Sequence, residues 1–482
     1  VRRLIPCRGL PPTHDTNRSE HTVKIGLTLG SLLLGSTAIL LGQMSADAVP
    51  GGDGAAGSVG ADVAVCDMPS IYRWGVSGGI QGYSVGTTSV NLGDVDLEWY
   101  ANNNRHPRIP QNLFQFEDGR LKQIGMSWCK DGFCALQQNQ CGSCDPAGFG
   151  CPQLLGPGCS DPYSDSINGD QSGLAPRSQC NAATGWYQYP PQNLPGAAPT
   201  IGRRMQVLQA DLVPESNPGS NYYCDSIYLH AQDYEAGNQL NNASYRKVNV
   251  GSFSNNSGYR LNPTGGTRLG LPGIFAWEEN SSTVELRPVD IPNDGRVWVA
   301  SDVIDNGNGT YRYEYAVYNL TSDYNVNGFE IPVPAGANIT GIGFNDIDSH
   351  SGEPYDTGDW ASAVVGNAVV WSTDEYSQNP DANAIRWGTM YNFWFTCDAE
   401  PAEGTGVVDV FRTNSSVDVQ DIAVPGQAAN PYDMNNSGCV DGADVGIFIT
   451  QWGAPGGFAD FNADGVVNSA DLGLLIAAWG CG

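Results

Sequence analysis

The stretch "RVWVASDVIDNGNGTYRYEYAVYNLT", residues 296–321, decides the expected fold. Apolar and polar residues alternate in both halves, which is the period of a β-strand with one buried face. Between the halves lies Asn306-Gly307-Asn308-Gly309, and these residue types tolerate the positive φ of a tight turn. The stretch therefore predicts a β-hairpin.

Short strand-like segments continue on both sides of this hairpin. Downstream they are "FEIPVP", "NITGIGFND", "AVVWST", "WGTMYNFWFTC" and "GVVDVFR", at the near-regular spacing of a β-sandwich. Upstream, "SIYRWGV", "RRMQVLQADLV" and "NYYCDSIYLHAQ" alternate with Gly, Pro and Asn turns. We predict a mainly β protein with β-sandwich-type domains of short antiparallel strands, followed by a small α-helical module at the C-terminus.

The N-terminal region has the pattern of an export signal. Lys24 precedes an apolar segment, residues 25–42, and Ala46-Asp47-Ala48 fits a cleavage site, which predicts a mature start near Val49. A transmembrane anchor is the alternative, because the apolar segment is just long enough to span a bilayer. Initiation at Val23 would leave residues 1–22 untranslated.

Export changes the interpretation of the 13 cysteines. Cys7 precedes the predicted cleavage site, and an even number remains in an oxidising compartment, so we expect about six disulfides. The alternative for the cluster at residues 129–151 is a zinc site, because Cys141-x-x-Cys144 has ligand spacing.

The net charge of −28 disfavours nucleic acid and anionic membranes as partners and suits divalent cations.

The segment "DFNADGVVNSAD", residues 460–471, has oxygen-bearing side chains at loop positions 1, 3, 5, 9 and 12 and glycine at position 6, as an EF-hand-type calcium loop requires. Residues 433–444, "DMNNSGCVDGAD", repeat this frame 27 residues upstream. The same offset relates two apolar stripes at helical spacing, which predicts two packed loop-helix units. The stripes are Val445, Phe448, Ile449 and Trp452, and Leu472, Leu475, Ile476 and Trp479.

Residues 433–482 resemble the type I dockerin module, a duplicated calcium-loop-plus-helix segment that docks onto a cohesin domain. The resemblance implies two calcium ions and a cohesin-like or cell-surface partner. Ser437 stands where an acid is usual, so the first loop should bind calcium more weakly. The implied ligands are Asp433, Asn435, Ser437, Cys439, Asp441 and Asp444 in the first loop, and Asp460, Asn462, Asp464, Val466, Asn468 and Asp471 in the second.

We also predict a disulfide between Cys439 and Cys481. Cys439 occupies loop position 7, where only the backbone carbonyl coordinates, and Cys481 directly follows the second expected helix. Packing of the two units would bring the end of that helix near the start of the module.

Evidence for catalysis is sparse. The "GVSGG" segment at residues 75–79 fits the nucleophile-elbow pattern of a serine hydrolase around Ser77, but a glycine-rich chain produces this pattern easily. Residues 343–360 concentrate acids, for which three interpretations stay open: general acid and base work on a glycosidic bond, a second metal or ligand site, or a solvated acidic loop. These acids are Asp346, Asp348, Glu353, Asp356 and Asp359.

The expected organisation is a leader and signal peptide (1–48), a flexible leader (49–65), a Cys-rich β domain (66–290), a β-sandwich-like domain (291–424), a linker (425–432) and the dockerin-like module (433–482). The segments before the module resemble a group of secreted bacterial proteins of unknown role. The leading hypothesis is a secreted protein that the module attaches or assembles at the cell exterior. The alternatives are an extracellular glycoside hydrolase acting on polysaccharide and a non-catalytic carbohydrate- or surface-binding protein.

Overall fold

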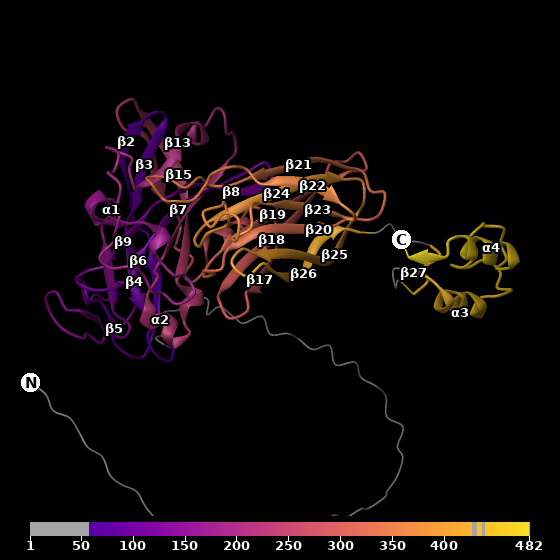
Figure 1. Cartoon of the computed structure of the whole chain (residues 1–482), viewed down its shortest axis with the longest axis horizontal. Coiled ribbons are helices and arrows are strands. Elements are labelled where there is room, and N and C mark those ends of the chain that lie inside the picture. Colours follow the sequence, from indigo (N-terminus) through magenta and orange to yellow (C-terminus); the bar gives the residue numbers. More distant parts are fainter. Residues whose placement is uncertain (1–56, 427–430, 436–438, 482) are drawn as a thin grey trace, which may run out of the picture. The chain divides into compact units, whose positions relative to one another are not determined.

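The computed structural model describes residues 57–426, 431–435 and 439–481 (Figure 1). The predicted signal peptide, part of the leader, half of the linker and the predicted calcium ligand Ser437 lie outside the described residues. The described chain is mainly β with antiparallel sheets, which confirms the predicted fold class. None of the helices in the described ranges has the length and apolar character needed to cross a membrane.

An eight-stranded antiparallel sheet organises the first part of the chain. Its strands in spatial order are β16 (Gly258–Pro263), β15 (Ala243–Ser254), β14 (Asn221–Ile227), β7 (Gln111–Glu117), β8 (Arg120–Met126), β13 (Met205–Leu208), β3 (Ile80–Val85) and β2 (Ile71–Ser77). Three smaller sheets accompany it: β1 (Val63–Asp67), β4 (Thr87–Asn91) and β11 (Ser160–Tyr163); β10 (Leu154–Leu155) and β5 (Leu97–Glu98); β12 (Leu174–Ala175), β9 (Cys129–Asp131) and β6 (Arg108–Ile109).

Helices in this part are short. They are α1 (Asp165–Asn168), α2 (Ala231–Ala236) and the 3-10 helices η1 (Gln171–Gly173), η2 (Arg177–Gln179), η3 (Gln209–Leu212), η4 (Gln239–Asn241) and η5 (Gly273–Trp277).

The second part is a sandwich of two five-stranded sheets (Figure 1). One sheet has the order β17 (Glu285–Asp290), β18 (Arg296–Asp305), β19 (Tyr311–Asn319), β24 (Met390–Cys397) and β21 (Ile339–Asn345). The other has the order β22 (Ala361–Val365), β23 (Ala368–Ser372), β20 (Val326–Pro332), β25 (Pro401–Val410) and β26 (Ser415–Pro425). Tyr315 and Phe393 of the first sheet and Phe329 and Trp371 of the second are buried in one apolar core.

The hairpin expected from residues 296–321 forms as β18 and β19, with Asp305 opposite Tyr311. Its turn places Gly307 and Gly309 at φ of 71° and 79°, where side chains other than glycine are strained. Asn306 N donates to Thr310 O at 3.0 Å and closes the turn.

Hydrogen bonds and one apolar cluster join the sandwich to the eight-stranded sheet. The cluster contains Phe114 and Tyr223 of the eight-stranded sheet together with Ala316 and Tyr318 of the sandwich. The Arg120 guanidinium on β8 donates to the buried carboxylate of Glu314 on β19 at 2.7 and 2.8 Å. The domain boundary at residue 290 stays a prediction, and the two sides of it share this core.

The cysteines correct one prediction. In the part of the chain before the C-terminal module, three disulfides of described residues join Cys66 to Cys141, Cys134 to Cys151 and Cys144 to Cys159. Four buried cysteines, Cys129, Cys180, Cys224 and Cys397, are free thiols. The prediction of about six disulfides is therefore wrong, because these four cysteines are unbonded. Cys224 and Cys397 lie in different apolar cores and cannot pair with one another, and Cys129 and Cys180 lie side by side as thiols. The zinc alternative is also wrong, because Cys141 and Cys144 are both oxidised.

Candidate functional site

The loop at residues 460–471 folds around its own acidic side chains before helix α4 (Ser469–Ala477). The carboxylate of Asp460 accepts Asp464 N at 3.1 Å and Gly465 N at 2.8 Å. Asp464 in turn accepts Val466 N at 3.0 Å. Gly465 takes a φ of 91°, so the sharp turn expected at position 6 needs glycine.

Asp471 ties the start of this loop to the start of the helix. Its carboxylate accepts Asn462 N at 3.1 Å and Asn468 N at 2.9 Å. The Asn468 side chain caps the helix by accepting Ala470 N at 2.8 Å, and together these bonds form a capping box.

The described residues of the first loop repeat this frame at the offset of 27. Asp444 accepts Asn435 N at 3.2 Å and Asp441 N at 2.8 Å, as Asp471 does with Asn462 and Asn468. Asp441 caps helix α3 (Gly442–Thr450) by accepting Ala443 N at 2.7 Å. The repeat in the sequence is therefore a repeat of backbone structure.

The charge state of these loops suits a divalent cation. Burial alone would raise the pKa of Asp444. The backbone N–H groups that donate to this carboxylate have the larger combined effect, and they hold its pKa below the usual value. The amide of Asn462 and the N–H of Val466 likewise lower the pKa of Asp464. Ionised carboxylates and amide oxygens are the hard ligands that calcium takes, so the donor set of both loops fits this ion.

The module core differs in part from the predicted stripes. Val440, Phe448, Val467 and Leu475 are buried together, with Val445 and Leu472 packed against them. Ile449, Trp452, Ile476 and Trp479 are exposed by 59%, 51%, 54% and 55% of their surface, so their predicted place in the stripes is wrong. The helices end at Thr450 and Ala477, before each Trp, and residues outside the helices fill the core instead.

A comparison with protein families identifies this module. Residues 431–478 match the Dockerin type I domain. The match confirms the resemblance that the duplicated loops suggested, and it makes this part of the chain a calcium-binding attachment or assembly module. No curated protein matches the chain at a significant level.

A short β-ladder joins the two ends of the dockerin module. β27 (Cys439–Val440) pairs with β28 (Gly480–Cys481), and Cys439 lies opposite Cys481. Cys439 is disulfide-bonded. The side chain of Cys481 lies outside the described residues, so the bond between these two cysteines stays a prediction.

The five acids of residues 343–360 do not converge on one site. Asp346, Asp348 and Asp359 line one cavity of about 500 Å³ beside Lys122 and Asp211. Burial raises the pKa of Asp346 to about 6, the Asn383 amide opposes this rise, and the nearby charges of Asp348 and Asp359 add to it.

The other two acids have separate structural surroundings. Glu353 is buried and accepts Arg177 N at 2.5 Å and Ser178 N at 3.2 Å. Asp356 accepts the Asn379 amide at 2.8 Å. Outside the two loops of the dockerin module, no three acidic, histidine or cysteine side chains in the described ranges are arranged closely enough to hold a metal ion.

The remaining catalytic candidate, Ser77, and two buried histidines have structural surroundings too. Ser77 ends β2 at a hairpin whose turn residues, Gly78 and Gly79, have φ of 60° and 82°; an elbow needs a strand followed by a helix, which this segment lacks. His230 and His350 are buried, and each ring hydrogen-bonds a backbone carbonyl, of Glu98 and Met126 respectively.

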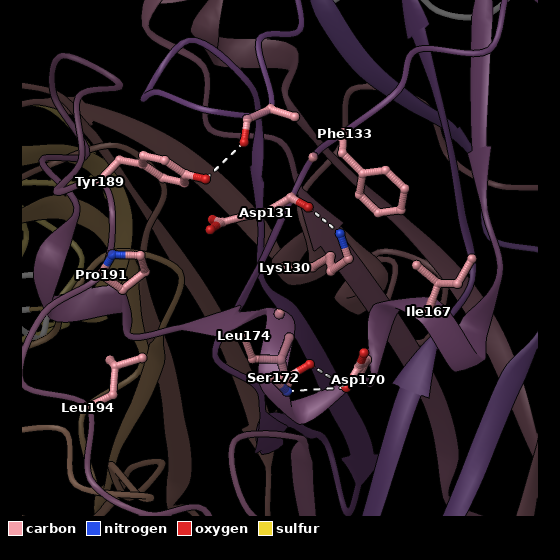
Figure 2. A pocket seen from close by; sticks show the side chains of 13 residues that line it. Lys130, Asp131, Phe133, Ile167, Asp170, Ser172, Leu174, Tyr189, Pro191 and Leu194 are labelled. Atoms are coloured by element: carbon pink, nitrogen blue, oxygen red, sulfur yellow. Dashed lines mark hydrogen bonds between the residues drawn. The ribbon is translucent and has the colours of Figure 1, made fainter. Parts of the chain in front are cut away.

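Sequence reasoning missed a second cavity, of about 470 Å³, around Lys130 and Asp131 (Figure 2). Its walls come from β9, from β12, from the segment around α1 and from residues 189–194. The only sequence signal was a lysine in a chain with few of them, followed by an acid.

Proposed function

We propose that this chain is an extracellular protein whose dockerin module attaches it, in a calcium-dependent manner, to a cohesin-like partner. The observation that carries the proposal is the duplicated loop frame at residues 433–444 and 460–471, within the segment that matches the Dockerin type I domain. The β-sheet region would be what the module attaches.

Each loop would hold one calcium ion. The side chains at positions 1, 3, 5 and 12 and the carbonyl at position 7 would be the ligands, with position 9 acting directly or through water. Bound calcium would supply the positive charge that keeps these acids in one compact loop. Ser437 replaces an acid in the first loop, so the second loop should bind more tightly.

The docking surface would use the exposed apolar residues of both halves. Ile449 and Trp452 are exposed in one half, and Ile476 and Trp479 at the same offset in the other. Exposed tryptophans are unusual on a soluble surface and are enriched at protein interfaces. Calcium would act indirectly, by fixing the helices that present these side chains.

Calorimetric titration of the full chain with calcium tests the sites. We expect two binding events, with Asp460→Ala removing the tighter event and Asp433→Ala the weaker one. Asp418→Ala, at an exposed acid of β26, is the matched control and should leave both events unchanged. Absence of any calcium binding by the unaltered chain would refute the proposal.

Capture by purified cohesin domains tests docking. Binding should disappear with a chelator and return when calcium is added in excess. Changing Trp452 and Trp479 together to Ala should remove capture while both calcium events remain. Capture that ignores the chelator would contradict calcium-dependent docking.

Export is part of the proposal, since dockerin modules act outside the cell. Cleavage after Ala48 would yield a protein beginning at Val49. N-terminal sequencing of the protein from the culture medium should find Val49, and recovery only from the cell interior would contradict export.

We propose hydrolysis of a glycosidic bond as a second function, because Asp346 meets a general acid's requirement. Its pKa is raised to about 6, so the carboxyl is largely protonated only in mildly acidic solution, below about pH 6, and Asp348 and Asp359 line the same cavity. Reducing-sugar release from a panel of polysaccharides should fall at least about a hundredfold in Asp346→Asn. No release by the unaltered protein from any substrate would remove this function.

A further inference from the structure

The cavity of Figure 2 has a charged floor and an apolar rim. Lys130 on β9 and Leu174 on β12 are cross-strand partners, both buried, so the sheet register fixes them side by side on the floor. Five apolar or aromatic side chains form the rim: Phe133, Ile167, Tyr189, Pro191 and Leu194.

The ammonium group of Lys130 has N–H donors that the described residues do not use. Its residue surface is only 4% exposed, and its Nζ donates to Asp131 O and lies 4.4 Å from the Phe133 ring centre. An ammonium group has three N–H donors, and this is its single hydrogen bond among the described residues. Burial lowers the pKa of Lys130 to about 8 against the opposing effect of nearby acids, so the group stays largely protonated at neutral pH.

Two carboxylates face the same space. Asp131 accepts the Arg108 Nε at 2.8 Å. Asp170 accepts Ser172 N at 3.2 Å and Ser172 Oγ at 3.0 Å, both with its Oδ1 atom. Its Oδ2 atom accepts no hydrogen bond from the described residues, so it can take a donor from a ligand.

These charges select against a charged ligand. An anion would approach two carboxylates, and a cation would approach the buried ammonium of Lys130. A neutral molecule that carries both acceptors and donors avoids both penalties, and its acceptors can use the spare N–H groups of Lys130.

The arrangement of the walls adds a shape requirement. In Figure 2, Lys130 and Asp131 lie toward one end of the cavity and Asp170 and Ser172 toward the other, with apolar side chains on either side. A ring with hydroxyl groups on its edge and C–H groups on its faces matches this distribution. We propose that this cavity binds the pyranose ring of a neutral sugar, with one hydroxyl accepting from Lys130 and another donating to Asp170.

Saturation-transfer NMR of the full chain tests the proposal. The probes are the neutral methyl glycosides of glucose, mannose, galactose and xylose, with cellobiose and maltose to distinguish a free sugar from a chain end. We expect at least one neutral glycoside to bind. Methyl glucuronide and glucosamine, which place a charge on a similar ring, should bind at least about tenfold more weakly.

Two variants locate the binding. Gly173 lines the cavity, and a Cβ there would meet open space, so Gly173→Phe should obstruct the cavity without a clash. Its matched control is Gly266→Phe, at a glycine with equally open surroundings outside the cavity. Lys130→Met should also abolish binding, whereas Lys247→Met on β15 should not; if Lys130→Met does not fold, the Gly173 pair decides.

Four results would overturn the proposal. These are the absence of binding by every neutral glycoside, equal binding of the charged rings, equal binding of cyclohexanol as an apolar ring, and unchanged binding in Gly173→Phe. None of these outcomes depends on calcium or on docking, so the proposal can fail while the dockerin function stands.

Discussion

His350 is neutral in the folded protein because its ring is removed from water. Its Nε2 donates to Met126 O at 2.8 Å, and its Nδ1 lies 2.9 Å from Ser351 Oγ. Desolvation lowers the pKa of His350 to about 4, and it lowers the pKa of His230 to about 3. Neither histidine is poised for acid or base work near neutral pH.

These two histidines predict a loss of stability in acid. Between pH 6.5 and about 4, His350 is protonated in the unfolded chain but stays neutral in the folded chain. The free energy of unfolding therefore falls as pH falls through this window. The loss is up to about 3 kcal/mol for a fully buried ring.

We expect His350→Gln to flatten this part of the stability profile, because glutamine can keep the bond to Met126 O without titrating. Urea unfolding followed by tryptophan fluorescence at several pH values measures it. His230→Gln provides a parallel case, and profiles that stay parallel to that of the unaltered chain would contradict the expectation.

At the scale of elements, the β18–β19 hairpin depends on its turn. Gly309 has a φ of 79° and open space where a Cβ would lie, so Gly309→Ala adds backbone strain without a steric clash. We expect a loss of about 1 kcal/mol in the free energy of unfolding. Gly266→Ala, which also meets open space but has no positive φ, should change stability by less than about 0.5 kcal/mol; equal effects of both changes would refute the strain argument.

The elements that the sequence predicted well are those whose signal is local. The alternation and turn of residues 296–321 contain all that the hairpin needs. The eight-stranded sheet needs more, because its neighbours β13 and β3 are far apart in the chain and no local pattern encodes that pairing. The predicted stripe of α3 failed at Trp452 because periodicity alone does not reveal that the helix ends at Thr450. It failed at Ile449, which lies inside the helix, because that position is exposed rather than packed in the module core.

The β27–β28 ladder leads to a prediction about the dockerin module. Cys439 and Cys481 are opposite one another in it, and Cys439 is disulfide-bonded. A bond between them would close a loop of about 40 residues and stabilise the module by up to about 4 kcal/mol in the chain-entropy model.

Mass spectrometry of a non-reduced digest should find the peptides of Cys439 and Cys481 linked. Cys439→Ser and Cys481→Ser should then lower the unfolding temperature of the module equally, and the double change should add nothing. Linkage of Cys439 to any other cysteine would remove the prediction.

At the scale of the whole molecule, the two candidate sites differ in how far sequence could reveal them. Each calcium loop is one contiguous segment and the two loops repeat each other, so residue type and a constant offset were sufficient to predict them from the sequence. The cavity around Lys130 gathers side chains from β9, β12 and residues 189–194, and only the folded chain brings them together. The acids of residues 343–360 show the converse: Glu353 and Asp346 are close in sequence, yet the folded chain places them in different surroundings.

The stability of the module and that of the β-sheet region should respond differently to calcium. The β-sheet region has large apolar cores and three disulfides, whereas the module has a small core of its own and loops rich in carboxylates. Without a cation those carboxylates repel one another, so the folded module is linked to calcium binding. Scanning calorimetry should therefore show one transition that moves to lower temperature with a chelator and another that does not. Asp460→Ala should lower the first transition in calcium, Asp418→Ala should lower neither, and a chelator effect of equal size on both transitions would show that the module does not hold the calcium.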